Sequence, residues 1–331
     1  MHVDEFLDPK ILIVSGKGGV GKTTVAAALA IVAARHGRKV CMAEIDRKGT
    51  LPKLFGGGKV TYEPRELSPG VWGLNIIPED ALAEYLRVQY HMSRISRVFR
   101  STHFVDYITT AAPGLKDILV LGKIWYLEQD RDHGGGAHGF DTIIVDAPAA
   151  GHMATFLRAP QGLADAVRLG PVRRQSEWLN DMLTDPKRSR VHLVSLAEEM
   201  PVTETLETSG ALVKDLGISQ GALFANGIYS RLLSDEEADE FERVAADGKI
   251  DELYDVAKAS GINLDDDDLE ALHGYAHFLK VRRSIQSLHL RKLRRGATQP
   301  VIELPFLFSA GLALPDIETL ADVIEEQMDT L

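Results

Sequence analysis

The chain has 331 residues, of which 45% are apolar and 26% are charged. This is the composition of soluble globular proteins, and it excludes collagen-like, low-complexity and wholly disordered chains. The net charge of −11 disfavours a surface committed to nucleic acid or anionic lipid, and the single cysteine, Cys41, can form neither an internal disulfide nor a thiolate metal cluster alone. We therefore expect a cytoplasmic protein, and the longest apolar run, residues 25–34, is too short to cross a membrane.

Apolar runs and helical patterns alternate along the chain, which predicts a doubly wound, mostly parallel α/β sheet. The run at residues 11–15 predicts a buried central strand. A glycine-rich turn follows it, and then an alanine-rich helix from about Lys22 to His36, which Gly37 ends. Further strands are predicted at residues 39–46, 71–77, 140–146, 190–196, 222–226 and 300–304.

Two stretches do not fit this alternation. Residues from about 79 to 131 and from about 160 to 189 are largely helical in pattern, and both are longer than a crossover between parallel strands requires. They predict a helical subdomain inserted into a single domain that spans residues 1–331. Such an insertion serves either as extra scaffold or as a surface for a partner, and periodicity alone favours scaffold.

The glycine-rich turn reads GKGGVGKTT and matches the pattern G-x-x-x-x-G-K-[ST] between a strand and a helix. Glycines let the backbone approach a phosphate closely, and the N–H groups of the loop and of the helix N-terminus attract the anion. We expect Lys22 to contact the β and γ phosphates, Thr23 to bind Mg²⁺ and Thr24 to bond the α phosphate. The predicted nucleotide-binding residues are Gly16, Lys17, Gly18, Gly19, Val20, Gly21, Lys22, Thr23 and Thr24.

A second lysine, Lys17, follows Gly16 directly. In this the loop resembles the deviant Walker A class of P-loop ATPases, which includes the MinD and ParA proteins, the nitrogenase iron protein and the arsenical pump-driving ATPase. The resemblance implies that Lys17 reaches the nucleotide of a partner subunit. It implies catalytic roles for Lys17 and Lys22.

The segment from Asp146 to His152, DAPAAGH, is similar to the D-T-A-P-T-G-H segment of the arsenical pump-driving ATPases and of the ATPases for guided entry of tail-anchored proteins. The resemblance implies that Asp146 holds a water bound to Mg²⁺. It also implies a nucleotide-sensing switch made of Asp146, Pro148, Gly151 and His152.

The resemblance to this family spans most of the chain. Asp46, at the start of DRKGTL, matches the switch aspartate that orients the attacking water, although the family's Pro-Ala-His does not follow it. Asn226 matches an asparagine that contacts adenine, and Pro305 and Phe306 match the adenine loop. The segments PGLKDILVLGKI and HLVSLAEEMPVTETLE resemble the short actinobacterial branch, some members of which pair with a paralogue.

The sequence also departs from several members of this class. It has no C-x-x-C pair for a zinc-bridged dimer and too few cysteines for an arsenite site or an iron–sulfur cluster. Tandem members carry two P-loops, whereas this sequence carries one. If the nucleotide lies between two subunits, a second polypeptide must therefore supply the other half.

Other polar clusters have simpler explanations than a site. His273 and His277 lack a third ligand, and the acidic run at residues 265–268 lacks the spacing of a calcium loop. The acidic run instead predicts the start of a helix that ends in the basic cluster at residues 291–295. Residues 315–331 predict an amphipathic helix whose acidic face is wrong for binding a membrane.

The leading interpretation is a Mg²⁺-dependent ATPase that acts as a dimer and passes a nucleotide-driven change of shape to a protein client or partner. ATP and Mg²⁺ are the expected cofactors, and the partner is either a second copy or a paralogous subunit. Two alternatives stay open: a nucleotide-binding regulatory subunit with little activity alone, and a positioning ATPase of the MinD or ParA type. We expect neither nucleic-acid binding nor stable membrane insertion.

Overall fold

The computed structural model describes residues 3–45, 49–90, 114–129, 139–167, 169–231, 234–246, 255 and 257–330. The strands in this part are β1 (Ile11–Gly16), β2 (Val40–Ile45), β3 (Arg65–Ser68), β4 (Val71–Ile76), β5 (Thr142–Ala149), β6 (Ser189–Leu196), β7 (Gln220–Ile228) and β8 (Val301–Pro305). The helices are α1 (Val3–Leu7), α2 (Lys22–Arg35), α3 (Leu51–Leu54), α4 (Pro78–Tyr90), α6 (Leu115–Gln129), α7 (Ala150–Ala166), α8 (Pro171–Thr184), α9 (Glu199–Lys214), α10 (Asp235–Ala246), α12 (Asp266–Gly296) and α13 (Leu314–Thr330).

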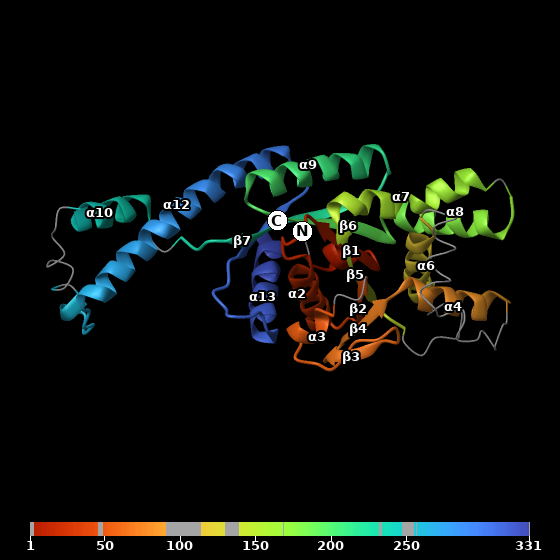
Figure 1. Ribbon diagram of the computed structural model, residues 1–331, viewed down its shortest axis with the longest axis horizontal. Coiled ribbons are helices and arrows are strands. Elements are labelled where there is room, and N and C mark those ends of the chain that lie inside the picture. The colour runs from red at the N-terminus through yellow and green to blue at the C-terminus, as the bar shows by residue number, and fades with distance from the viewer. Residues whose placement is uncertain are drawn as a thin grey trace.

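The strands form one sheet in the order β3-β4-β2-β5-β1-β6-β7-β8. All neighbouring strands pair in parallel except β3, which is antiparallel to β4 at the sheet edge. Helices cover both faces, so the predicted doubly wound α/β fold is confirmed (Figure 1). Because the central strands are parallel, their carboxyl ends lie along one edge, where ligands bind in folds of this kind.

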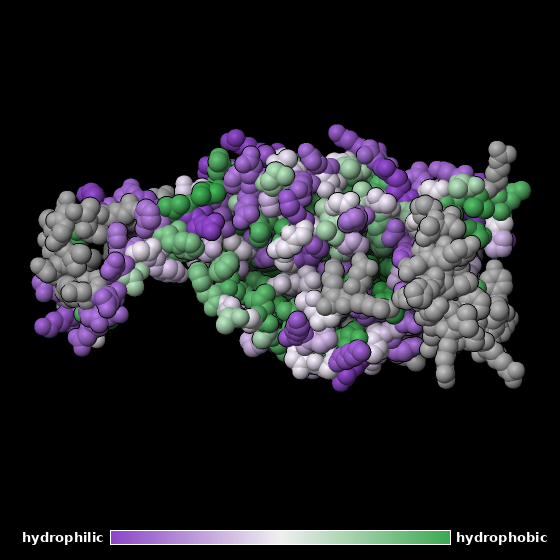
Figure 2. Space-filling view, in the orientation of Figure 1, coloured by the Kyte–Doolittle hydropathy of each residue, from purple (hydrophilic) through white to green (hydrophobic). Residues whose placement is uncertain are grey.

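Two groups of helices extend from the two sides of this body (Figure 1). On one side α4, α6, α7 and α8 pack against one another. On the other side α12 leaves the body as a long helix with α10 alongside it, and we call this pair the arm. Figure 2 shows hydrophobic surface where the arm joins the body.

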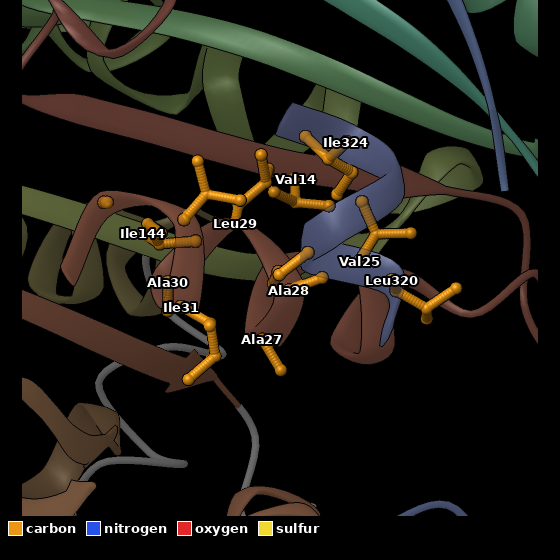
Figure 3. Packing of buried hydrophobic residues seen from close by; sticks show 14 of the residues in the cluster. Val14, Val25, Ala27, Ala28, Leu29, Ala30, Ile31, Ile144, Leu320 and Ile324 are labelled. Carbon is orange, nitrogen blue, oxygen red and sulfur yellow. The ribbon is translucent and has the colours of Figure 1, made fainter. Parts of the chain in front are cut away.

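The core lies in two layers because side chains of a strand alternate between the faces of the sheet. Leu12 and Val14 of β1 face a cluster with α2 and α13, whereas Ile11 and Ile13 face a cluster with helices α6 to α9 and α12. The alanines of α2 permit its close approach to the sheet, and Leu320 and Ile324 of α13 pack beside it (Figure 3). Each fully buried branched side chain contributes about 1.5–3 kcal/mol. This packing fixes the start of α2 next to the end of β1.

Most predicted elements are present within one to three residues of their expected ends. The main corrections are that β5 continues past Asp146 to Ala149, and that α1 and the edge strand β3 were not predicted. β5 continues because Gly16 still pairs with Ala149 across a bulge, and the Ser15 hydroxyl donates to the Pro148 carbonyl at 2.8 Å. Both α1 and β3 are too short for periodicity to reveal.

The predicted helical insertions correspond to α4 and α6 and to part of α7 with α8. α7 is continuous through Pro160, where the second insertion was expected to begin. Residues 91–113 and 130–131 of the first insertion lie outside the described residues. In the described part of the chain, no helix is long and apolar enough to span a bilayer.

The acidic run at residues 265–268 begins α12, as predicted. The Asp265 side chain accepts a hydrogen bond from the Asp268 backbone N–H, and the Asp268 side chain accepts one from the Asp265 N–H. This capping box satisfies two backbone donors that the first turn of a helix leaves without partners. The final helix, α13, is also confirmed, and its apolar side packs against α2.

His192 is a fully buried histidine in β6. Its ring lies between Phe6 and Phe224, with centroid distances of 4.7 and 6.0 Å, and its Nδ1 accepts the Ala222 backbone N–H at 3.1 Å. Gly221 is required beside it, because a Cβ there would lie 2.1 Å from the ring. Burial lowers the pKa of His192 to about 3, so the ring is neutral in the folded protein at neutral pH.

We predict that His192 makes the fold acid-sensitive. The pKa of an unfolded histidine is about 6.5, so between that pH and about 3 the unfolded chain binds a proton that the folded chain does not. The free energy of unfolding should therefore fall on acidification by up to about 1.4 kcal/mol per pH unit. Urea unfolding from pH 7.5 to 5 should show a shallower fall for His192→Gln, which keeps an acceptor for Ala222. The exposed His277→Gln is the control, and equal slopes for wild type and His192→Gln would contradict the prediction.

Candidate functional site

The predicted phosphate loop connects β1 to α2, as its sequence requires. Gly19 and Gly21 have φ values of 83° and 91°, which are unfavourable for residues with a side chain. At Gly21 a Cβ would also lie 2.2 Å from the Asn226 amide nitrogen, so the position is closed to side chains for two reasons. Gly21 precedes α2 without a side-chain cap, which leaves the N–H groups of the first helical turn for a ligand.

Lys22 and Thr23 lie at the start of α2. The Lys22 ammonium donates to the Lys17 carbonyl at 2.9 Å, and its side chain is largely buried. The Thr23 hydroxyl donates to Asp146 Oδ2 at 2.7 Å. Asp146 is buried in β5, directly opposite Val14 of β1, so the sheet places this carboxylate under the loop. The structure therefore brings together the two residues predicted to bind Mg²⁺.

A cavity of about 800 Å³ opens over the loop, within the size range of ligand sites. Eight predicted site residues line it: Gly18, Gly19, Gly21, Lys22, Thr23, Thr24, Pro148 and His152. The other lining residues were not predicted: Thr50, Asp117, Ala149, Thr155 and Phe156. Gly151 is exposed in the first turn of α7, next to His152. The cavity thus lies between the phosphate loop and the predicted switch.

Lys17 has a different environment from Lys22. Its ammonium forms an ion pair with Glu204 of α9 at 2.6 Å, and the two side chains are 34% and 35% exposed. Lys17 is not among the described residues that line the cavity. Ion pairs this exposed contribute about 0–1 kcal/mol, so a competing anion can displace Glu204 at little cost. Gly16 beside it must be glycine, because a Cβ would lie 2.1 Å from the Val194 carbonyl oxygen.

The residues predicted to contact adenine lie on the β7 and β8 side of the loop. The Asn226 side-chain amide donates to the Val20 carbonyl at 2.9 Å, so this asparagine supports the loop. The Phe306 N–H donates to the Ile228 carbonyl at 2.8 Å, and the Phe306 ring stacks on Tyr229 at 4.8 Å. Asn226, Pro305 and Phe306 are not among the described residues that line the 800 Å³ cavity. Asp46, the predicted water-orienting residue, lies outside the described residues.

Sequence reasoning missed Glu44, a fully buried carboxylate in β2. It accepts hydrogen bonds from the Gly49 N–H at 3.0 Å, the Thr50 N–H at 2.8 Å and the Asn75 side-chain amide at 3.1 Å. Glu44 is also the register partner of Asp146, so two buried carboxylates lie side by side on adjacent strands. The available signal was a glutamate inside an apolar strand, which burial disfavours unless it is paired.

We predict that Glu44 anchors the chain that follows the predicted switch aspartate. Glu44→Gln replaces one acceptor oxygen with a donor, which leaves a backbone N–H of Gly49 or Thr50 without its partner. The substitution should lower the free energy of unfolding by about 1.5–3 kcal/mol and speed amide hydrogen exchange at residues 49–50. Glu66→Gln is the matched control, because Glu66 is an exposed carboxylate that accepts the Gly70 N–H at 3.3 Å. Equal effects of the two substitutions would contradict the assignment.

Known proteins resemble this chain over much of its length. Residues 9–174 match the family model described as anion-transporting ATPase. ATPase BagA of Mycobacterium tuberculosis (strain H37Rv) is 33% identical over 331 residues, which cover 96% of this chain and 93% of that protein. The arsenical pump-driving ATPase of Acidiphilium multivorum is 25% identical over 70% of this chain and 41% of that protein. The protein of the same name in Escherichia coli is 26% identical over 67% of this chain and 40% of its own length. The chain therefore belongs to the anion-transporting ATPase family, and it is an ATP hydrolase.

Proposed function

We propose that the protein hydrolyses Mg²⁺-ATP as a nucleotide-switched dimer and transmits the resulting change of shape to a protein client or partner. The observation that carries this proposal is the separation of the two loop lysines. Lys22 lines the cavity of its own chain, whereas Lys17 is not among the described residues that line it and forms a partly exposed ion pair with Glu204. A lysine in that position can stabilise phosphoryl transfer in a neighbouring subunit, as cations supplied by a partner do in other P-loop enzymes.

The residues around the loop fit Mg²⁺. A threonine hydroxyl and a carboxylate lie 2.7 Å apart, and both are oxygen ligands of the kind that Mg²⁺ prefers, directly or through water. Glu44, the register partner of Asp146, adds a second buried negative charge at this edge of the sheet. Thr23 and Asp146 would hold the ion, which neutralises phosphate charge when it is bound.

Different groups of the protein would contact different parts of the nucleotide. The loop N–H groups bind the phosphates, Lys22 compensates the charge on the β and γ phosphates, and Thr24 bonds the α phosphate. Asn226, Pro305 and Phe306 form the side of the loop where we place the base. Asp46 would orient the attacking water. Hydrolysis breaks the bond between the γ phosphorus and the bridging oxygen, and water supplies the new oxygen.

The switch connects the cavity to the helical side of the molecule. β5 passes under the loop and enters α7 at Ala150, so Gly151 and His152 are in the first turn of that helix. The N–H groups of a first helical turn bind anions, and the presence or absence of the γ phosphate would therefore move α7. α7 packs against α6, α8 and α9, which would carry the movement into the proposed helical subdomain.

The helical subdomain has a surface suited to an apolar client segment. α4, α6 and α8, with one residue of α7, enclose a cavity of about 210 Å³. Trp125 and Trp178 stack at 5.5 Å in its wall, and Trp178 stays 44% exposed. The buried Lys123–Glu84 pair, at 2.9 Å, provides a fixed polar point in this otherwise apolar site. Apolar pockets with few polar groups bind ligands.

A heteromeric ATPase, in which a paralogue replaces the second copy, is the second candidate function. The partly exposed ion pair of Lys17 supports a heterodimer as much as a homodimer, because the lysine would serve whichever subunit lies opposite. Turnover that appears only after a paralogue is added distinguishes this candidate from the homodimer.

We predict that Lys17→Ala loses turnover but keeps ATP binding. Without a cation supplied in trans, turnover at saturating ATP should fall at least about 10²-fold, a smaller loss than the 10³–10⁵ of an arginine finger. Lys22→Ala should also bind ATP more weakly, because Lys22 lines the cavity itself. Steady-state phosphate release and equilibrium binding of a labelled ATP analogue measure the two effects.

The control for these variants is Lys214→Ala, an exposed lysine at the end of α9 far along the chain from the loop. It should behave as wild type in both assays. Unchanged turnover of Lys17→Ala would show that this lysine has no role in hydrolysis, and unchanged turnover of Lys22→Ala would remove the proposed enzyme site.

A further inference from the structure

The arm helix α12 has apolar residues on two opposite sides. Leu290 and Leu293 are buried against the body, and Leu279 is buried nearer the start of the helix. On the other side, Phe278, Val281, Ile285 and Leu288 are between 39% and 58% exposed. At 3.6 residues per turn these four lie within a sector of about 80°. Phe278 packs on Tyr229 at 5.5 Å, and in the described part of the chain the four residues form an apolar strip that is only partly covered. Apolar patches on a surface can mark interfaces.

The spacing of this strip is that of a coiled coil. Phe278, Val281, Ile285, Leu288, Lys292 and Arg295 follow one another at intervals of 3, 4, 3, 4 and 3 residues. Alternating intervals of 3 and 4 keep one seam toward a partner helix. We call these six residues the α12 seam.

The apolar part of the α12 seam is symmetric about position 283. Phe278 and Leu288 are each five residues from it, and Val281 and Ile285 are each two residues from it. An antiparallel pair of identical helices with its twofold axis at this position would therefore place Phe278 against Leu288 and Val281 against Ile285. A twofold interface requires a patch that is complementary to itself in this way.

The charges on α12 favour the same antiparallel arrangement. Its first turns carry Asp267 and Glu270 on the seam side, whereas its last turns carry Lys292 and Arg295 there, of which Lys292 also donates to the Thr203 hydroxyl of α9 at 2.8 Å. With the axis at position 283, Arg295 of one helix lies opposite residue 271 of the other, next to Glu270. A parallel pair would instead bring acid against acid and base against base, which is destabilising. Gly274, which has open space around it, permits close approach where Lys292 would cross.

We infer that the α12 seam is an interface with a second copy of this chain, whose α12 helix packs against it in antiparallel orientation. This inference rests on the dimer in the proposed function and names a contact for it outside the phosphate loop. From Asp267 to Arg295 the contact would extend about 42 Å at 1.5 Å per residue.

The same helix holds the loop that carries Asn226. The Gln286 side chain donates to the Gly227 carbonyl at 2.7 Å and accepts the Tyr229 N–H at 2.9 Å. Arg283 donates to the Tyr229 carbonyl at 3.1 Å. Asn226 in turn donates to Val20 in the phosphate loop. Gln286 directly follows the seam residue Ile285 in the sequence. A partner helix on the α12 seam would therefore contact the helix next to the side chains that hold this loop, and pairing of the arms could affect the nucleotide site.

Disulfide trapping between two singly substituted chains tests the orientation. One full-length chain carries Val281→Cys, the other carries Ile285→Cys, and each has its own tag. The native Cys41 is buried and burial raises the pKa of its thiol, so it stays unreactive. The antiparallel pair predicts a mixed disulfide between the two chains. In this arrangement position 281 of one chain is displaced by about 6 Å along the helix axis from position 281 of the other, and the same holds for position 285. Disulfides between two chains with the same substitution should therefore be rare.

The control chains carry Leu272→Cys, which is also exposed on α12 but lies on the opposite side from the α12 seam. They should give no disulfide with either partner. Self-disulfides in excess of mixed ones would indicate parallel pairing and overturn the inference. No disulfide above the Leu272→Cys background would overturn it as well.

Sedimentation equilibrium, with and without Mg²⁺-ATP, measures what the seam contributes. Val281→Glu with Ile285→Glu should raise the dimer dissociation constant at least tenfold, whereas Leu272→Glu should leave it unchanged. Glu270→Lys should weaken the dimer, and adding Arg295→Glu to the same chain should restore it. The inference is contradicted if the double-glutamate chain has the same dimer dissociation constant as wild type. It is also contradicted if Arg295→Glu does not restore the dimer of the Glu270→Lys chain.

These outcomes separate the interface from the proposed function. If the double-glutamate chain still dimerises on adding Mg²⁺-ATP as wild type does, the phosphate-loop dimer stands and the α12 seam does not form the interface. If wild type hydrolyses ATP but stays monomeric in every condition, both the dimer and the seam fail while the enzyme site stands.

Discussion

The hydrogen bond from Asn226 to the Val20 carbonyl, at 2.9 Å, joins the end of β7 to the phosphate loop. The loop has little other support on this side, because Gly19 and Gly21 carry no side chains and adopt left-handed conformations. Glycines lose more conformational freedom on folding than other residues do. A loop of this composition binds phosphate well only if the surrounding structure holds it in shape, and Asn226 and the buried start of α2 do so.

Two buried carboxylates complete the opposite side of the loop. Asp146 accepts the Thr23 hydroxyl, and Glu44 accepts the backbone N–H groups of Gly49 and Thr50. Because Glu44 and Asp146 are register partners on adjacent parallel strands, their charges are concentrated at one edge of the sheet. Buried charges require partners, and carboxylate oxygens are among the ligands that Mg²⁺ prefers. The fold thus holds both carboxylates in position in the absence of a nucleotide.

The parts of the site that are local in sequence could be predicted from it. GKGGVGKTT fixes the loop by its own glycines and its place between a strand and a helix, and the position of Asp146 follows from its place near the end of an apolar strand. Contacts between distant segments could not be predicted in this way. The Lys17–Glu204 ion pair joins residues 187 positions apart, and the Asn226–Val20 hydrogen bond joins residues 206 apart. The exposure of the α12 seam was also invisible, because α12 is apolar on both sides and only packing decides which side is covered.

The central claim is that two chains share each catalytic site, and mixing two inactive variants tests it most directly. Lys17→Ala keeps an intact phosphate loop but lacks the lysine for its neighbour, whereas Lys22→Ala keeps Lys17 but has a defective loop. In a mixed dimer the Lys22→Ala chain would supply Lys17 to the loop of the other chain and restore one site. We predict that ATP turnover of the mixture exceeds the sum of the separate variants and increases with protein concentration. Turnover equal to that sum at every ratio and concentration would contradict the account.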